Sequence, residues 1–126
     1  RGDAMTKKIL AVDDSPSVRK LVEFSLKRGG FQVTTAQDGQ EALDIIVRDS
    51  FDAVILDVNM PRLDGFEFLR RMKADPTLAS IPVVMLTTEG HEMDKQRAEE
   101  LGATSYLVKP FKPTTLLDVI NNVLSG

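Results

Sequence analysis

The sequence predicts a doubly wound α/β domain, in which helices cover both faces of a parallel sheet of five strands. Five short aliphatic runs alternate with five amphipathic segments along the 126 residues. The aliphatic runs are continuous, as expected for strands that are buried on both faces. Strict alternation of strands and helices implies parallel strands joined by right-handed crossovers, which leaves few topologies.

The expected strands are the five aliphatic runs, taken in chain order. They span Ile9–Val12, Phe31–Thr35, Ala53–Leu56, Val83–Leu86 and Tyr106–Val108. The expected helices lie between and after them, over about 16–28, 38–46, 64–74, 92–101 and 113–124. The first three helices open with residues typical of N-caps, namely Ser15 before Pro16, Asp38 with Glu41, and Asp64 with Glu67.

The fourth expected helix, Glu92–Leu101, has few apolar side chains to anchor it. Two interpretations are open: a short solvated helix, or a marginally held element that moves. The methionines at 60, 72, 85 and 93 are interpreted as core or near-core residues rather than a recognition stripe. His91, the only histidine, is expected to be a solvated loop residue.

Composition limits the possible functions. A hydrophobic fraction of 42% supports a real core, and the net charge of −3 provides no basic surface for nucleic acid or an anionic membrane. The absence of cysteine excludes disulfides and thiol catalysis, and no aliphatic run approaches the roughly 20 residues that span a bilayer. Residues 1–4 precede Met5 and are interpreted as a vector remnant, so we expect one domain over residues 5–126.

Polar residues cluster where four of the strands end. Asp13-Asp14, Asp57, Thr87-Thr88 and Lys109-Pro110 each follow an aliphatic run. Ligands of open α/β sheets bind at this carboxyl edge. Three carboxylates gathered there would repel one another, and a hard cation such as Mg²⁺ relieves that repulsion. Thr87 and Lys109 can donate to phosphoryl oxygens, so the pattern predicts Mg²⁺ and a phosphoryl group on Asp57.

The same residues resemble the receiver domain of two-component response regulators, most closely the single-domain chemotaxis (CheY-like) type. The shared motifs lie within residues 7–124: Asp13-Asp14, Asp57-Val58-Asn59-Met60-Pro61 with Asp64-Gly65, Thr87-Thr88 and Lys109-Pro110-Phe111. The resemblance implies a flavodoxin-like (βα)5 sandwich with strand order 2-1-3-4-5. By itself Asp64 is explained as an N-cap, and Thr88 as a structural or rim residue.

The resemblance also implies roles at the site. Asp57 would attack the phosphorus of a phosphohistidine or a small phosphodonor. Asp14 and Asp57 would bind Mg²⁺ through their carboxylates, Asn59 through its main-chain carbonyl, and Asp13 mainly through water. Thr87 and Lys109 would bind the phosphoryl oxygens.

Further implied features concern switching and lifetime. Thr87 would move toward the phosphate and Tyr106 would turn inward, although Tyr106 can also be a half-buried strand aromatic. The Lys109-Pro110 bond would be cis. Asn59 and Glu89 would tune the phosphoryl lifetime, which we expect to be seconds to minutes. The responding surface would run from about Gly90 through the fifth strand and the last helix.

The implied partners are a sensor histidine kinase (CheA-like) as donor and a protein target such as the flagellar switch. The resemblance implies a cytoplasmic monomer that does not contact nucleic acid or insert into membranes. It would be no enzyme beyond its own phosphorylation and dephosphorylation.

Three alternatives stay open on the sequence. A haloacid-dehalogenase-like Mg²⁺ phosphatase also uses an aspartyl phosphate, but it normally has a second Asp where this chain has Asn59, and a cap domain for which the chain has no room. The chain can also be a receiver cut from a longer transcription regulator. Finally, a stand-alone receiver can serve a cell-cycle, sporulation or kinase-relay pathway rather than motility.

Overall fold

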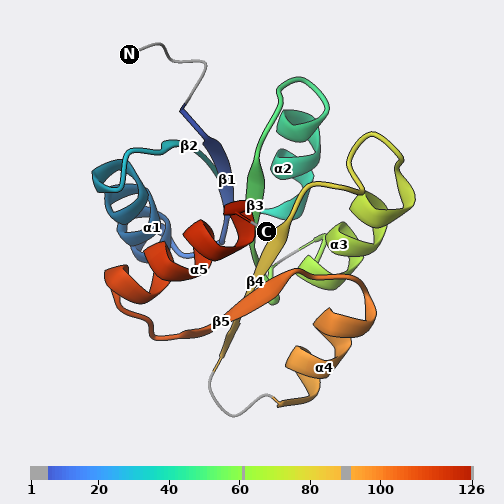
Figure 1. Ribbon diagram of the computed structural model, residues 1–126. Helices are drawn as coiled ribbons and strands as arrows, with labels where there is room; N and C mark the ends of the chain where they lie inside the picture. The colour runs from blue at the N-terminus through green and yellow to red at the C-terminus, as the bar shows by residue number, and fades with distance from the viewer. Residues whose placement is uncertain (1–5, 61, 89–91, 126) are drawn as a thin grey trace.

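The chain adopts the expected doubly wound sandwich (Figure 1). A computed structural model describes residues 6–60, 62–88 and 92–125. Its parallel sheet has the order β2-β1-β3-β4-β5, which confirms the predicted fold class and strand order. The elements in chain order are β1 (Lys8–Val12), α1 (Pro16–Arg28), β2 (Gln32–Ala36), α2 (Gly39–Ile46), β3 (Ala53–Asp57), α3 (Gly65–Ala74), β4 (Val83–Thr88), α4 (Glu92–Glu100), β5 (Ser105–Lys109) and α5 (Pro113–Ser125).

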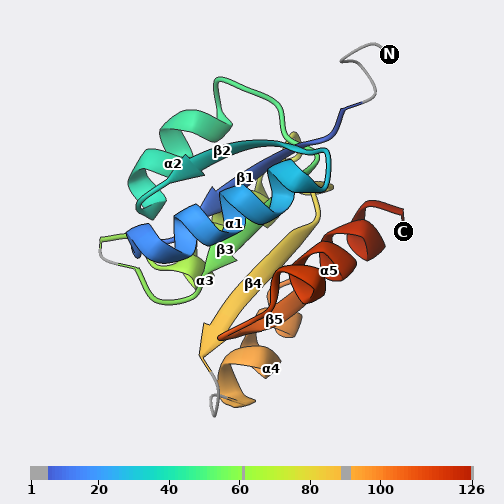
Figure 2. The same ribbon diagram turned by 90° about the vertical axis from the view of Figure 1, so that its left-hand side faces the viewer.

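The sheet separates two apolar layers. Helices α1 and α5 cover one face, and α2, α3 and α4 cover the other (Figures 1 and 2). Successive side chains of a strand point to opposite faces, so Leu10 and Val12 of β1 pack on the α2–α4 side while Ile9 and Ala11 pack on the α1–α5 side. This two-layer core fixes the register that brings the strand ends to one edge.

Burial differs between central and edge strands. All five residues of β3 are buried, whereas only Ala36 of β2 and only Leu107 of β5 are. The expectation that all five strands are buried on both faces is therefore wrong for β2 and β5. These strands lie at the sheet edges, where fewer neighbouring elements cover them.

The predicted N-caps are confirmed. The side chains of Ser15, Asp38 and Asp64 accept hydrogen bonds from the main-chain N–H groups three residues onward, at 3.3, 2.9 and 2.9 Å. The reciprocal half of a capping box is not formed to the cap residue. The Glu41 carboxylate accepts from the N–H of Gln37, the residue before the cap Asp38. The Glu67 carboxylate instead pairs with arginines on α3.

At their carboxyl ends, β3, β4 and β5 extend into the polar residues that follow the predicted aliphatic runs. Asp57 is the last residue of β3, Thr87 and Thr88 end β4, and Lys109 ends β5. Their main chains are held in the parallel ladder, with Asp57 opposite Leu86 and Thr88 opposite Lys109. The sheet itself, rather than a loop, therefore positions these functional candidates.

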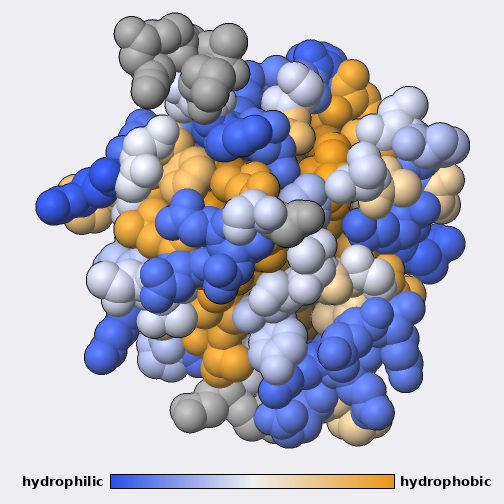
Figure 3. All heavy atoms as spheres, in the orientation of Figure 1, coloured by the Kyte–Doolittle hydropathy of each residue, from blue (hydrophilic) through white to orange (hydrophobic). Residues whose placement is uncertain are grey.

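Helix α4 is the least anchored helix of the fold. Ala98 is its one buried residue, and Met93 is 76% exposed. The interpretation of Met93 as near-core is thus wrong, whereas the methionines at 60, 72 and 85 are buried. The side chains of Lys95 and Arg97 lie over the rings of Tyr106 and Phe66, each at 4.5 Å from the centroid. Figure 3 shows a hydrophilic surface where α4 lies in Figure 1.

We expect α4 to open locally without global unfolding. Its amide protons should exchange through openings several kcal/mol below the global free energy of unfolding, because little apolar surface holds the helix. Native-state hydrogen exchange measures this, with the buried amides of β3 as the reference. Equal protection of α4 and β3 would contradict the expectation.

The helices of the fold do not resemble membrane spans. Within the described parts of the chain, none is both long enough and apolar enough to cross a bilayer.

Candidate phosphoryl and metal site

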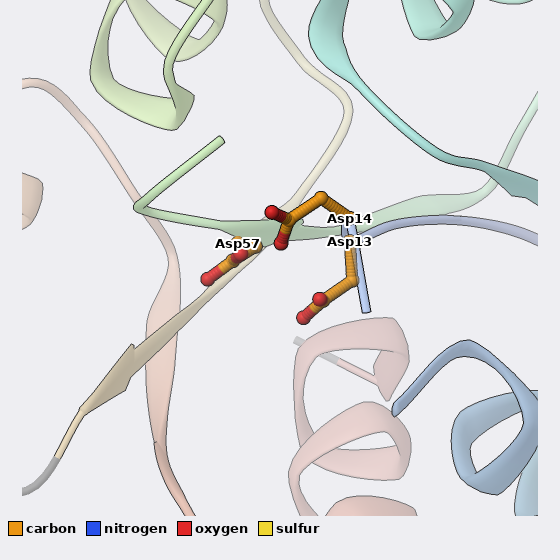
Figure 4. A group of neighbouring side chains, drawn as sticks. All are labelled: Asp13, Asp14 and Asp57. Carbon is orange, nitrogen blue, oxygen red and sulfur yellow. The ribbon is translucent and has the colours of Figure 1, made fainter. Parts of the chain in front are cut away.

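Three carboxylates meet at the carboxyl edge of the sheet. Asp13 and Asp14 follow β1. Asp57 ends β3, which pairs directly with β1 in the sheet. One carboxylate oxygen from each residue lies within 4.8 Å of the others (Figure 4). Asp13 and Asp57 are buried, at 2% and 4% exposure, whereas Asp14 is exposed. The sequence therefore predicted the cluster correctly as a set of neighbours.

Lys109 places an ammonium group among these acids. Its Nζ lies 2.8 Å from Asp13 Oδ2 and 3.2 Å from Asp57 Oδ1. Burial lowers the pKa of Lys109, but the Asp13 and Asp57 carboxylates outweigh it and raise the pKa above its usual value. Lys109 is therefore a fixed positive charge at the site, paired with two of the three clustered carboxylates among the described residues.

The crowding of negative charge affects the pKa of the Asp57 carboxyl. Burial, followed by the charge of Asp13, raises the pKa of Asp57 to about 6. Lys109 and the main-chain N–H of Asn59 lower this pKa, but they compensate only in part. The charged form of Asp57 is therefore disfavoured at the site unless additional positive charge arrives.

The donor set fits a hard divalent cation. Asp13 Oδ2 is buried and accepts no hydrogen bond of good geometry from the described residues, although it forms an ion pair with Lys109. A buried oxygen in this state, next to two further carboxylates, suits Mg²⁺, which prefers a few carboxylate ligands completed by water and phosphate oxygens. The chemistry of the residues therefore supports the predicted cation.

The remaining predicted residues lie on β4, on β5, just after β3, or outside the described residues. Thr87 is buried on β4, next to β3, and Thr88 is exposed. Tyr106 is half-buried on β5 and packs against the α2–α4 core layer. Asn59 is exposed two residues beyond Asp57, and Glu89 lies outside the described residues, as do Gly90 and His91. The Lys109-Pro110 peptide bond is cis.

Main-chain contacts hold Asp13 in place. Its N–H donates to the carbonyl of Ala36 on β2 at 3.1 Å, and its Oδ1 accepts from the N–H of Ser15 at 2.9 Å. Arg19 Nη1 donates to the Asp13 carbonyl at 2.7 Å. Arg19 was not predicted from the sequence to support the site, although a basic residue in the first turns after an acidic strand end is a usable signal.

Just beyond Asp57, the main chain that follows β3 is held by β4 and by the start of α3. The N–H of Val58 donates to Leu86 O, and the N–H of Gly65 donates to Val58 O, each at 3.0 Å. A Cβ at position 65 would lie inside van der Waals contact with the Asp57 carbonyl oxygen and 3.0 Å from Val58 Cα. Glycine at 65 therefore lets α3 start directly against the Asp57 backbone.

Residues 9–121 match the family described as the response regulator receiver domain. The chain belongs to this family. The membership confirms the predicted resemblance and favours a receiver over the haloacid-dehalogenase-like phosphatase. Members of the family serve as phosphoacceptors in two-component signalling rather than as classical enzymes.

The similar proteins include a chemotaxis regulator and transcriptional regulators. The receiver is 45% identical to chemotaxis protein CheY4 of Vibrio cholerae, with a TM-score of 0.90 over 95% of this chain and 100% of that chain. It is 42% identical to the alkaline phosphatase synthesis transcriptional regulatory protein PhoP of Bacillus subtilis, over 86% of this chain and 45% of PhoP. It is 43% identical to the probable transcriptional regulator ycf27 of Guillardia theta, over 97% of this chain and 47% of ycf27. The receiver thus spans about half the length of these curated relatives.

Mg²⁺ should stabilise the receiver in a pH-dependent way. At pH 7, Mg²⁺ at 100 times its Kd should raise the free energy of unfolding by about 2.7 kcal/mol. The gain should shrink at pH 5, because protons compete for Asp57, whose pKa is raised to about 6. Thermal unfolding at both pH values measures the effect. Asp118→Asn removes an exposed carboxylate of α5 that is not part of the cluster, so this control should keep the full gain. An equal gain at both pH values would count against the site.

Proposed function

We propose that this receiver accepts a phosphoryl group on Asp57 from a phosphohistidine of a sensor histidine kinase. The observation that supports this most strongly is the buried Asp57 carboxylate beside Asp13 and Lys109, at the edge where Asp14 also lies. In the transfer, an Asp57 carboxylate oxygen forms a bond to phosphorus while the bond from phosphorus to the histidine nitrogen breaks. The products are an acyl phosphate on Asp57 and a free histidine on the kinase.

Each residue at the site has a proposed part in this transfer. Asp13, Asp14 and Asp57, with the main-chain carbonyl of Asn59, would hold Mg²⁺, which when bound supplies positive charge to the phosphoryl oxygens. Lys109 already lies 3.2 Å from Asp57 Oδ1 and donates to the phosphoryl oxygens as they arrive.

Two further roles concern the phosphorylated state. The Thr87 hydroxyl on β4 moves toward the phosphoryl group and donates to it. The Tyr106 ring, on the neighbouring strand β5, then turns inward. Asn59 and Glu89 set the lifetime of the acyl phosphate, which we expect to be seconds to minutes. The proposed receiver covers residues 5–126.

Uptake from a small donor tests the proposal. Radiolabelled acetyl phosphate should label the protein only when Mg²⁺ is present, and Asp57→Asn should abolish the label. Asp64→Asn is the matched control, because Asp64 is an exposed acid that caps α3 and asparagine also caps helices well. Label that survives acid, or that persists in Asp57→Asn, would contradict the proposal.

Two outputs are consistent with the proposed phosphorylation. One candidate is a single-domain chemotaxis-type regulator, in line with the likeness to CheY4 over that whole chain; the flagellar switch as its target rests on the sequence resemblance alone. Likeness to PhoP and ycf27 supports the receiver part of a transcriptional regulator. The reading frame beyond codon 126 decides between them: a following DNA-binding domain means transcription, and a stop codon favours the single-domain type.

A further inference from the structure

The loop between β3 and α3 contains a strained backbone residue. Arg62 has φ of 67°, and it is the only non-glycine residue with positive φ in the described parts of the chain. L-residues seldom adopt this conformation unless surrounding contacts impose it, and such residues concentrate at functional sites. The contacts of Arg62 therefore have to compensate for the strain.

An ion pair joins Arg62 to the start of α2. Its Nη1 donates to Asp38 Oδ2 at 2.9 Å, while Asp38 Oδ1 accepts from the N–H of Glu41 at 2.9 Å. The Asp38 side chain is only 6% exposed, although that of Arg62 is 70% exposed. One carboxylate thus caps α2 and anchors the loop, and losing Arg62 would leave a buried carboxylate oxygen without its partner.

Glycine contacts hold the loop on both sides of this pair. A Cβ on Gly39 would lie 2.5 Å from Leu63 O, so the first turn of α2 lies directly against the loop backbone. At the other end, the N–H of Gly65 donates to Val58 O. Between these points lies Asn59, two residues after Asp57, and its main-chain N–H lowers the pKa of the Asp57 carboxyl. The described residues on either side of position 61 are therefore held between α2 and β3.

We propose that Arg62 and Asp38 form a positioning pair that preorganises the Asp57 and Asn59 groups for a divalent cation. Neither residue belongs to the carboxylate cluster, so both act through the loop backbone. Outer contacts that orient metal ligands commonly affect metal affinity. The inference rests on the proposed function, because it concerns the cation of that same site.

For one variant, Coulomb attraction and the positioning pair predict opposite changes in Mg²⁺ affinity. Arg62→Gln removes a positive charge near an anionic cluster, so Coulomb attraction alone would make Mg²⁺ bind more tightly. Positioning predicts weaker binding for this variant, because the loop loses its anchor. Asp38→Asn weakens binding under both accounts. Arg62→Gln is therefore the decisive variant.

The experiment measures Mg²⁺ affinity by amide chemical-shift titration without a phosphodonor. We expect Arg62→Gln and Asp38→Asn each to weaken Mg²⁺ binding about three- to tenfold, and the double variant to be no weaker than the weaker single one. Arg62→Lys should recover part of the affinity. Arg62→Gly should weaken binding like Arg62→Gln but lower the Tm less than Arg62→Gln does, because glycine tolerates positive φ.

Arg71→Gln is the matched control. It removes the same charge from an exposed ion pair, formed with Glu67 at 3.0 Å on α3, and should leave Mg²⁺ affinity within twofold of wild type. Equal or tighter binding by Arg62→Gln, while wild type binds Mg²⁺, overturns the positioning pair and leaves the proposed function intact. A wild-type protein that binds no Mg²⁺ contradicts the proposed function as well.

Discussion

Gly65→Ala is expected to destabilise the protein by about 2–3 kcal/mol, through overpacking against backbone. The added methyl group would clash with the Asp57 carbonyl oxygen and approach Val58 Cα. Neither atom can rotate away as a flexible side chain would, so α3 or the end of β3 must shift. Because Asp57 is the last residue of β3, the same shift should displace its carboxylate and weaken Mg²⁺ binding.

Urea denaturation and Mg²⁺ titration measure the two effects of Gly65→Ala. The direction is diagnostic, since Gly→Ala within a helix normally stabilises by about 0.5–1 kcal/mol. Gly102→Ala is the comparison variant: its Cβ would meet only the flexible Lys73 side chain, and its φ of +98° should cost about 1–2 kcal/mol without touching the site. A Gly65→Ala protein as stable as wild type would show that the close approach of α3 is not required.

Asp57→Asn is expected to stabilise the metal-free protein at pH 7. Burial and the Asp13 charge raise the pKa of Asp57 to about 6, so its charged form is worse accommodated in the folded chain than in the unfolded one. A rise of two pKa units corresponds to about 3 kcal/mol, and allowing for solvent screening at the sheet edge we expect about 1–2 kcal/mol. Urea denaturation with a chelator present measures the gain.

The pH dependence has a defined sign. Between the folded pKa near 6 and the usual Asp value near 3.8, the folded state binds a proton that the unfolded state does not. This contribution to stability is fully present below pH 3.8 and is lost as the pH rises through 6. The advantage of Asp57→Asn should therefore fade as the pH falls from 7 to 4.

Saturating Mg²⁺ should stabilise wild type and do little for Asp57→Asn, because the variant lacks one of the proposed carboxylate ligands. Asp118→Asn controls for a general change of net charge. A destabilised Asp57→Asn protein in the absence of metal would contradict the electrostatic account of the cluster.

The sheet-edge cluster was predictable because strand position determines it. Asp13, Asp14, Asp57 and Lys109 each follow or end an aliphatic run, and a parallel sheet brings all such ends to one edge. The helix starts were predictable for a similar reason, since an N-cap is a local contact between residues three apart.

Contacts between separate loops were not predictable in this way. Arg62 and Asp38 are 24 positions apart, and neither residue type nor spacing indicates that they pair. The positive φ of Arg62 likewise follows from its neighbours, because residue type alone favours glycine or asparagine there. Met93 failed as a core assignment because its hydrophobicity says nothing about which face of α4 meets the sheet.

The most direct test of the account is to locate the phosphoryl group. After incubation with Mg²⁺ and acetyl phosphate, reduction of the acyl phosphate and peptide mapping should find the modification on Asp57. Asp13, Asp14 and Asp64 should remain unmodified, and chelation of Mg²⁺ should abolish the product. Modification of another residue, or undiminished modification under chelation, would contradict the central claim that Asp57 accepts the phosphoryl group at a cation-binding cluster.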